Sequence, residues 1–242
     1  MPSKTINGHA IDYTVIISTR RTSSARLKIT SSTTLEITIP SNYDAKKIDH
    51  LLIQKSAWIS RTTERLKGCE AAAGQLIQPG MELPLHGQMH QVVLHESTHH
   101  PGITLADNQR ILLRHQPGQT GQDVLKKILV IWYRRMAYQT LREKTEYWGG
   151  IIGARPNKIT IRDPKTRWGS CSARAAISYS WRIIMAPECV IDYLVVHELC
   201  HLRIPNHSTQ YWAFLARYIP DYEEQRRWLK QNGHLIMSLL GK

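Results

Sequence analysis

Cysteine is scarce in this chain of 242 residues and occurs in no paired motif. The four cysteines are Cys69, Cys171, Cys189 and Cys200, and no two of them form a Cys-x-x-Cys pair. A disulfide framework or a structural zinc ribbon usually carries such paired spacings, so the sequence argues against both. We expect Cys200, which lies in an apolar segment, to pack as a small hydrophobic residue.

Long apolar runs are also absent. No stretch approaches the roughly 18 consecutive apolar residues of a membrane span, and the opening residues MPSKTINGHAIDY lack the apolar central region of a secretion signal. We therefore expect a soluble, cytoplasmic protein without a membrane partner. A chain of this length can bury a substantial core as one large or two small domains.

Acidic residues are outnumbered by basic ones, 19 against 32, which gives a formal net charge of +13. Such a balance favours anionic partners, including nucleic acid. Aromatic residues are few, however, and no nucleic-acid-binding motif is visible. The basic excess is concentrated in residues 151–186, where Asp163 is the only acidic residue. The basic residues there are Arg155, Lys158, Arg162, Lys165, Arg167, Arg174 and Arg182. Two interpretations are open: a site for phosphate or nucleic acid, and an ordinary solvated surface.

The most informative motif that the chain does contain is His197-Glu198-Leu199-Cys200-His201. A helix turns about 100° per residue, so side chains four positions apart project from one face and can reach the same metal ion. Glu198 lies one step round the helix, where it can take a proton from a metal-activated water. The motif indicates a hydrolase with Zn²⁺ as cofactor, another divalent metal being the alternative.

A third metal ligand is needed, because catalytic zinc usually takes three protein ligands and leaves the fourth position for water. His207 is the nearest candidate, and Pro205 predicts that the helix has ended and the chain turns back before it. The alternative is a carboxylate from a following helix, Glu223 or Glu224. We favour His207 as the ligand that completes the set.

The same five-residue pattern also occurs at His95-Glu96-Ser97-Thr98-His99. Alternating residues precede it and a Pro-Gly turn signal follows it. In an extended chain, positions four apart are about 13 Å from one another. We interpret this second occurrence as chance.

The segment from residue 187 to 201 has the features of a buried helix. Pro187 suits a first helical position, and apolar residues recur at three- and four-residue steps. Asp192 is a candidate for orienting a metal ligand. Tyr193, Tyr211 and Tyr218 are candidate donors to an oxyanion, with a purely structural role as the competing interpretation.

Elements of both kinds are predicted before the motif. Residues 44–66 have helical spacing with Asp44 as a cap, and residues 75–115 return to short extended segments divided by turns. No internal repeat is visible. Strand-like alternation, which suggests a small antiparallel sheet, marks residues 11–17, 26–30 and 34–39.

Residues 119–121 form a plausible domain boundary. A long helix is predicted over 123–148, ending at Gly149-Gly150. Strands follow at 158–162 and 176–184, and residues 176–180 are our candidate for an edge strand beside the metal cleft. After the metal helix, further helices are predicted at 209–217 and 222–240, capped by Ser208 and Asp221.

These elements predict an α+β protein with two domains. Residues 1–118 would form a β-rich portion with one helix. Residues 122–242 would form a compact hydrolase domain with a long helix, a small antiparallel sheet and the metal helix.

Several separated segments carry a family resemblance. They are Arg162-Asp163-Pro164-Lys165-Thr166-Arg167-Trp168-Gly169-Ser170-Cys171-Ser172, Ala186-Pro187, the run from Val190 to His201, Asn206-His207-Ser208 and Tyr211-Trp212. In this order they resemble the YgjP-like metal-dependent hydrolases, relatives of the SprT-like and WLM metallopeptidases. The likeness is strongest over residues 158–222 and extends to the segment ending at Ile59. Relatives often have Tyr-Leu-Gly where this chain has Leu85-His86-Gly87, a departure remote from the metal-binding segments in sequence.

The resemblance implies that His197, His201 and His207 bind zinc, that Glu198 is the general base, and that the C-terminal domain is zincin-like. It implies a metallopeptidase and therefore a peptide substrate. YgjP itself is associated with pyrophosphohydrolysis of nucleoside triphosphates, particularly UTP, and wider relatives act on proteins attached to DNA.

Three functions follow as hypotheses. The first is a zinc-dependent hydrolase of the metallopeptidase type, using a metal-activated water and Glu198 as base. The second is a metal-dependent nucleoside triphosphate pyrophosphohydrolase acting on a nucleotide such as UTP. The third is a nucleic-acid-associated protease of the SprT-like type. The candidate substrate-binding residues are Arg162, Lys165, Arg167 and Trp168.

Overall fold

The computed structural model describes residues 2–21, 23–106 and 109–241, and it divides into two compact units. The first unit ends at Gly74 and the second comprises Gln75–Leu240. The sequence analysis instead placed the boundary at residues 119–121. The difference arises because the sheet that precedes this point packs its apolar face on the helix that follows it, in one continuous core.

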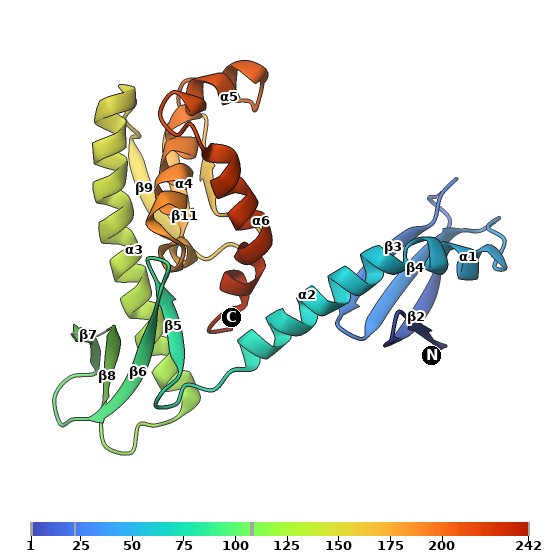
Figure 1. Ribbon diagram of the computed structural model, residues 1–242, viewed down its shortest axis with the longest axis horizontal. Helices are drawn as coiled ribbons and strands as arrows, with labels where there is room; N and C mark the ends of the chain where they lie inside the picture. Colours follow the sequence, from blue (N-terminus) through green and yellow to red (C-terminus); the bar gives the residue numbers. More distant parts are fainter. Residues whose placement is uncertain (1, 22, 107–108, 242) are drawn as a thin grey trace. The chain divides into compact units, whose positions relative to one another are not determined.

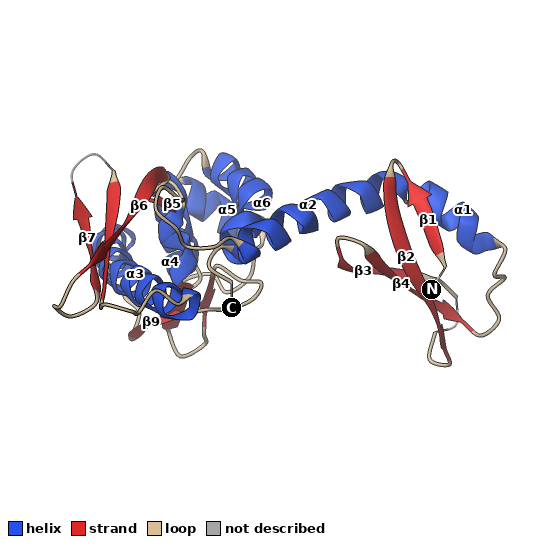
Figure 2. Ribbon diagram, turned by 90° about the horizontal axis from the view of Figure 1, so that it is seen from below, coloured by secondary structure: helices blue, strands red, loops and turns tan. Residues whose placement is uncertain are grey.

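The first unit contains one four-stranded sheet and two helices (Figure 2). The strands lie in the order β1-β2-β4-β3, with β2 and β4 parallel, so the predicted antiparallel sheet is in fact mixed. The predicted single helix is two helices that meet at Lys55. The elements are β1 Ser3–Ile6, β2 His9–Ser18, β3 Arg26–Ser31, β4 Thr34–Pro40, α1 Lys47–Gln54 and α2 Ser56–Gly74.

The second unit begins with a sheet that has the same topology as the first. Its order is β5-β6-β8-β7, again with the two central strands parallel and the outer pairs antiparallel. The first hairpin turn has positive φ at both residues in each sheet, Asn7-Gly8 and His86-Gly87. The chain thus contains a structural repeat that the sequence did not reveal, because alternation and turn geometry recur without recurring residues. The strands are β5 Glu82–Leu85, β6 Gln88–Glu96, β7 Gly102–Ala106 and β8 Arg110–His115.

Helix α3, Gln122–Ile152, links this sheet to the rest of the unit (Figure 1). One side of it is buried along its whole length, as its apolar spacing predicts. The helix ends at Gly153, which has the left-handed φ of 70° that favours glycine, rather than at Gly149-Gly150. Gly149 lies inside the last turn, where a Cβ would be 2.8 Å from the carbonyl oxygen of Ala154.

A three-stranded sheet follows α3, formed by β9 Lys158–Arg162, β10 Gly169–Cys171 and β11 Ala176–Ser180. The order β10-β11-β9 makes β11 the central strand, parallel to β9 and antiparallel to β10. The prediction that residues 176–180 form an edge strand is therefore wrong. The edge is formed by β10, which the sequence did not predict. The predicted strand at 176–184 is also shorter, because a 3₁₀ helix, Trp181–Met185, begins after Ser180.

Three helices complete the second unit: α4 Glu188–Cys200, α5 Thr209–Ala216 and α6 Tyr222–Ser238. Ser208 caps α5 as predicted, since its hydroxyl accepts a hydrogen bond from the Tyr211 N–H at 3.3 Å. Asp221 makes no such bond at α6 and instead accepts one from the Gln225 amide at 2.7 Å. Within the described residues, no helix combines the length and apolarity needed to cross a membrane.

Candidate metal centre

Helix α4 presents its two histidines on one face, as their spacing predicts. The helix follows Pro187 and runs through the core, with most of its side chains buried. His197 lies in its last turn and His201 is the residue that caps its C-terminal end. A helix held on several sides by packing gives these two rings a fixed position.

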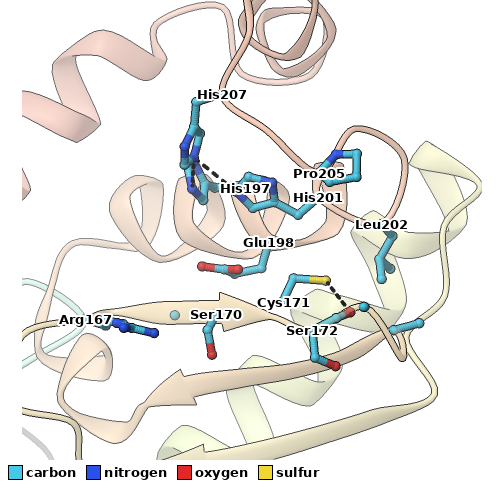
Figure 3. A pocket seen from close by; sticks show the side chains of 13 residues that line it. Arg167, Ser170, Cys171, Ser172, His197, Glu198, His201, Leu202, Pro205 and His207 are labelled. Atoms are coloured by element: carbon cyan, nitrogen blue, oxygen red, sulfur yellow. Dashed lines mark hydrogen bonds between the residues drawn. The ribbon is translucent and has the colours of Figure 1, made fainter.

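Three imidazole rings converge on one point. Nε2 of His207 lies 3.1 Å from Nε2 of His197 and 3.1 Å from Nε2 of His201 (Figure 3). The possible ligand atoms of the three residues all lie within 4.8 Å of one another. Tetrahedral zinc with Zn–N bonds of 2.0–2.1 Å sets neighbouring nitrogens about 3.3 Å apart. The observed spacing fits that geometry.

The protonation of these rings also suits a metal. Nδ1 of His201 lies 3.2 Å from the carbonyl oxygen of Ile204, which can only accept, so this nitrogen carries the proton and Nε2 offers its lone pair. Burial, together with the two neighbouring imidazoles, lowers the pKa of His197 to about 3 and keeps that ring neutral. One ring nitrogen of His207 cannot be a proper hydrogen-bond partner to two others at once. A cation shared by the three nitrogens would remove this conflict.

His207 is exposed and lies on the segment between α4 and α5, so its ring needs external support. That support is aromatic. The Trp212 ring stacks on His207 with centroids 5.3 Å apart, and Tyr222 also stacks on Trp212, at 5.2 Å. Arg226 lies 5.0 Å from the Trp212 ring centroid. The stack holds the His207 ring in an orientation that the backbone alone would leave free to rotate.

Tyr211 has a structural role in this centre. Its hydroxyl donates a hydrogen bond of 2.9 Å to the backbone carbonyl of His197, and its ring stacks on His201 with centroids 4.6 Å apart. The side chain is fully buried. It therefore ties both helical histidines together, which favours the structural interpretation over that of an oxyanion donor.

Glu198 lies between α4 and β10 (Figure 3). Its side chain is only 4% exposed, and Oε2 has no hydrogen-bond partner among the described residues. Burial raises the pKa of this carboxyl to about 8. The close fit depends on Gly169, since a Cβ at that position would lie 2.3 Å from Oε1 of Glu198. A buried carboxylate that nothing else satisfies is a costly feature unless the site uses it.

A cleft of about 580 Å³ opens beside these groups, and β10 forms one wall of it. The lining residues are Arg167, Gly169, Ser170, Cys171, Ser172, Ala173, Ala175, His197, Glu198, His201, Leu202, Pro205 and His207. The cleft therefore brings the histidine cluster, the glutamate and an edge strand together. Arg167 contributes its positive charge at one end (Figure 3).

The other candidate substrate residues are more scattered. Arg162 lines a second groove next to the metal cleft, and Arg167 lines both. Lys165 lines neither of these two. Trp168 packs against the core, its ring meeting α6 at Gly233.

The remaining alternatives lie away from the cluster. The candidate metal group found among the described residues contains neither Glu223 nor Glu224. Asp192 accepts hydrogen bonds from Lys144 at 2.9 Å and Trp148 at 2.8 Å, so it anchors α4 to α3 rather than orienting a metal ligand. His95 and Glu96 are the last two residues of β6 and the rest of the second HExxH pattern lies in a bend, so this pattern is not on a helix.

Sequence reasoning missed three supports of the site: β10 with Gly169, the Trp212 stack, and the turn at His86-Gly87. This turn, remote from the motif in sequence, packs on the start of α4, where His86 pairs with Glu188 at 2.8 Å. Gly169, directly before Ser170-Cys171-Ser172, was the one sequence signal that another group packs closely on this backbone. The other two depend on tertiary contacts.

Comparison with protein families agrees with this geometry. Residues 23–232 match the model of the YgjP-like metallopeptidase domain. The chain belongs to the YgjP-like metallopeptidase family. The sequence resemblance is thus confirmed, and membership places the chain among the metal-dependent hydrolases.

Beyond the family match, this YgjP-like chain shows little similarity to curated proteins or solved structures. None of the curated proteins matches it. Two similar solved structures are the metallopeptidase zymogens of Pyrococcus abyssi abylysin and Methanocaldococcus jannaschii jannalysin, 21% and 18% identical. Each covers 38% of this chain with a TM-score of 0.35, and the chain covers 93% and 95% of them respectively.

Proposed function

We propose that this protein is a zinc-dependent peptidase in which His197, His201 and His207 hold the metal and Glu198 is the general base. The observation that carries the proposal is the convergence of three Nε2 atoms beside a buried, unpartnered carboxylate in one cleft. Three imidazole nitrogen ligands suit Zn²⁺, although another divalent ion of similar preference would also fit.

When bound, zinc would supply Lewis acidity, lowering the pKa of water and polarising a carbonyl oxygen. Three protein ligands would leave zinc able to take a water molecule as well. Tyr211 keeps the two helical rings in register, and Trp212 holds His207 against them. These contacts set the geometry of the site before substrate arrives.

Glu198 would transfer the proton of the attacking water. It accepts a proton from the attacking water and delivers it to the leaving amine as the peptide bond breaks. Its burial strengthens its basicity, because the charged form has no hydrogen-bond partner within the described residues. A general base works best when its pKa lies near the pH of the reaction.

Strand β10 would bind the substrate. Its outer side, away from β11, pairs with no strand of the described chain, and it forms a wall of the cleft. An extended peptide can add to such an edge through backbone hydrogen bonds. That pairing would place a peptide bond next to Glu198, since Gly169 abuts the carboxylate. Proximity of this kind lowers the entropic part of the barrier.

The test is a substrate screen of zinc-loaded wild type beside the Glu198→Gln variant. We expect cleavage within a fluorogenic peptide library, reduced at least about 100-fold by the variant, while both proteins retain one metal per chain. Nucleoside triphosphates with added pyrophosphatase and phosphate detection run in parallel. Phosphate release from a triphosphate without peptide cleavage would instead support the pyrophosphohydrolase. Salt-sensitive retention on DNA, together with cleavage, would support a nucleic-acid-associated protease.

A further inference from the structure

The outer face of the three-stranded sheet carries a second groove, of about 500 Å³. Side chains of a strand alternate between its two faces. On β9, Ile159 and Ile161 pack against the core, so Lys158, Thr160 and Arg162 face outward. The groove is lined by Lys158, Thr160, Arg162, Pro164, Thr166, Arg167, Gly169, Ser170, Ser172, Ala176, Ile177 and Ser178.

This groove is positively charged without local compensation. Lys158, Arg162 and Arg167 line it, and none of the other described residues that line it carries a carboxylate. The nearest acidic residue in sequence, Asp163, accepts a hydrogen bond of 2.9 Å from Arg182 instead. No ion pair is found for the three cations within the described chain. The groove otherwise consists largely of hydroxyl groups, which can donate hydrogen bonds to an anion.

The groove and the metal cleft meet across β10. Four residues line both, Arg167, Gly169, Ser170 and Ser172. Figure 3 shows Ser170 on the side of β10 away from Glu198. The edge strand therefore separates a face that holds the metal ligands and the base from a face that holds the cations.

An extended peptide paired with β10 would present its side chains to these two faces in turn. We propose that the groove of Lys158, Arg162 and Arg167 is a specificity subsite for aspartate or glutamate side chains of the substrate, at alternate positions flanking the cleaved bond. This proposal rests on the peptidase function above. Planar guanidinium groups suit carboxylates. The described residues that line the groove include no aromatic ring to stack on bases, which argues for a peptide rather than a single-stranded nucleic acid.

The test compares three peptides that differ only at the outward positions, carrying aspartate, alanine or lysine. Wild type should cleave the aspartate peptide with a kcat/KM on the order of 10-fold above that of the alanine peptide, because two or three partly exposed charge contacts each contribute a few-fold. The lysine peptide should be the poorest substrate. The ratio should shrink as salt rises from 0.05 to 0.5 M, within the range where screening becomes strong.

Two double variants make the result specific. In Lys158→Glu/Arg162→Glu the preference should reverse towards lysine, a result that a purely structural role would not give. In Arg227→Ala/Lys230→Ala, which removes one arginine and one lysine from the exposed surface of α6, the aspartate preference should persist.

Several outcomes would overturn the subsite proposal. Cleavage of all three peptides at equal rates would refute the subsite but leave the proposed peptidase function standing. A preference that survives the charge reversal would do the same. Oligonucleotide binding that the charge reversal abolishes, without any acidic preference in peptides, would assign the groove to nucleic acid. If no peptide is cleaved, the peptidase proposal itself fails. The preference of the groove for acidic side chains is then tested by the binding of the same three peptides to Glu198→Gln, measured by fluorescence anisotropy. Equal affinities for the three peptides would overturn the subsite proposal.

Discussion

Replacing Gly169 by alanine should disable Glu198 and leave the histidine cluster intact. The added Cβ would lie 2.3 Å from Oε1, 2.8 Å from Cδ and 2.9 Å from Cγ of the glutamate. Ordinary contacts need about 3.4 Å or more, so the carboxylate must move by about 1 Å. It is 4% exposed and has little room to move without disturbing its neighbours. A displacement of about 1 Å at a catalytic group costs on the order of 100-fold in rate.

The assay measures kcat on a peptide that wild type cleaves, together with metal content by elemental analysis. We expect kcat to fall about 100-fold, with one metal retained per chain and stability reduced by about 1–3 kcal/mol. Gly150→Ala is the control, since that exposed helical position has no atom within 4 Å of an added Cβ. It should keep full activity.

A double variant isolates the mechanism. If the alanine acts only by displacing the base, then Gly169→Ala/Glu198→Gln should be no slower than Glu198→Gln alone, because no base is left to displace. Independent, additive losses would show that the glycine acts by another route. A folded Gly169→Ala variant with wild-type kcat would refute the reasoning.

Three further predictions concern the supports of the site. Trp212→Ala should weaken zinc binding about 10- to 100-fold in a chelator competition, because the ring that orients the third histidine is lost, whereas Trp58→Ala in the first unit should not; equal affinities would contradict the role of the stack. In metal-free protein, burial raises the pKa of Glu198 to about 8, so its stability cost grows as pH rises above the unfolded value of 4.5. The melting temperature of Glu198→Gln should therefore exceed that of wild type by more at pH 8 than at pH 5, and a constant gap would count against the shift. Gly87→Ala should lower the free energy of unfolding by about 1–3 kcal/mol more than Gly118→Ala. Both positions have positive φ, but only the first would press on the start of α4; equal losses would show that the contact is unimportant.

Much of the site could be predicted from local sequence. The four-residue spacing of His197 and His201 on an apolar helix fixes their common face. Pro205 predicted that this helix ends before it, and α4 does end, at Cys200. The same reasoning separated this motif from His95 and its neighbours, whose alternation is that of a strand. Periodicity and breakers carry this information because they act within a few residues.

Features that depend on tertiary packing were less accessible. Strand β10 has three residues, Gly169-Ser170-Cys171, with none of the β-branched or aromatic side chains that usually signal a strand. Its extended form comes from pairing with β11, and this pairing is also why β11 is central rather than an edge. The compact units divide at residues 74 and 75 rather than at 119–121 for a similar reason, since the sheet before α3 shares the core of the helix.

The central claim is that three imidazoles bind one metal ion. The most direct test is an anomalous difference map collected at the zinc edge from crystals of protein purified without chelators. We predict a single peak about 2.0–2.1 Å from Nε2 of His197, His201 and His207, facing the cleft that Glu198 lines. A map of zinc-supplied crystals with no peak there, or with the ion bound by other residues, would contradict the account.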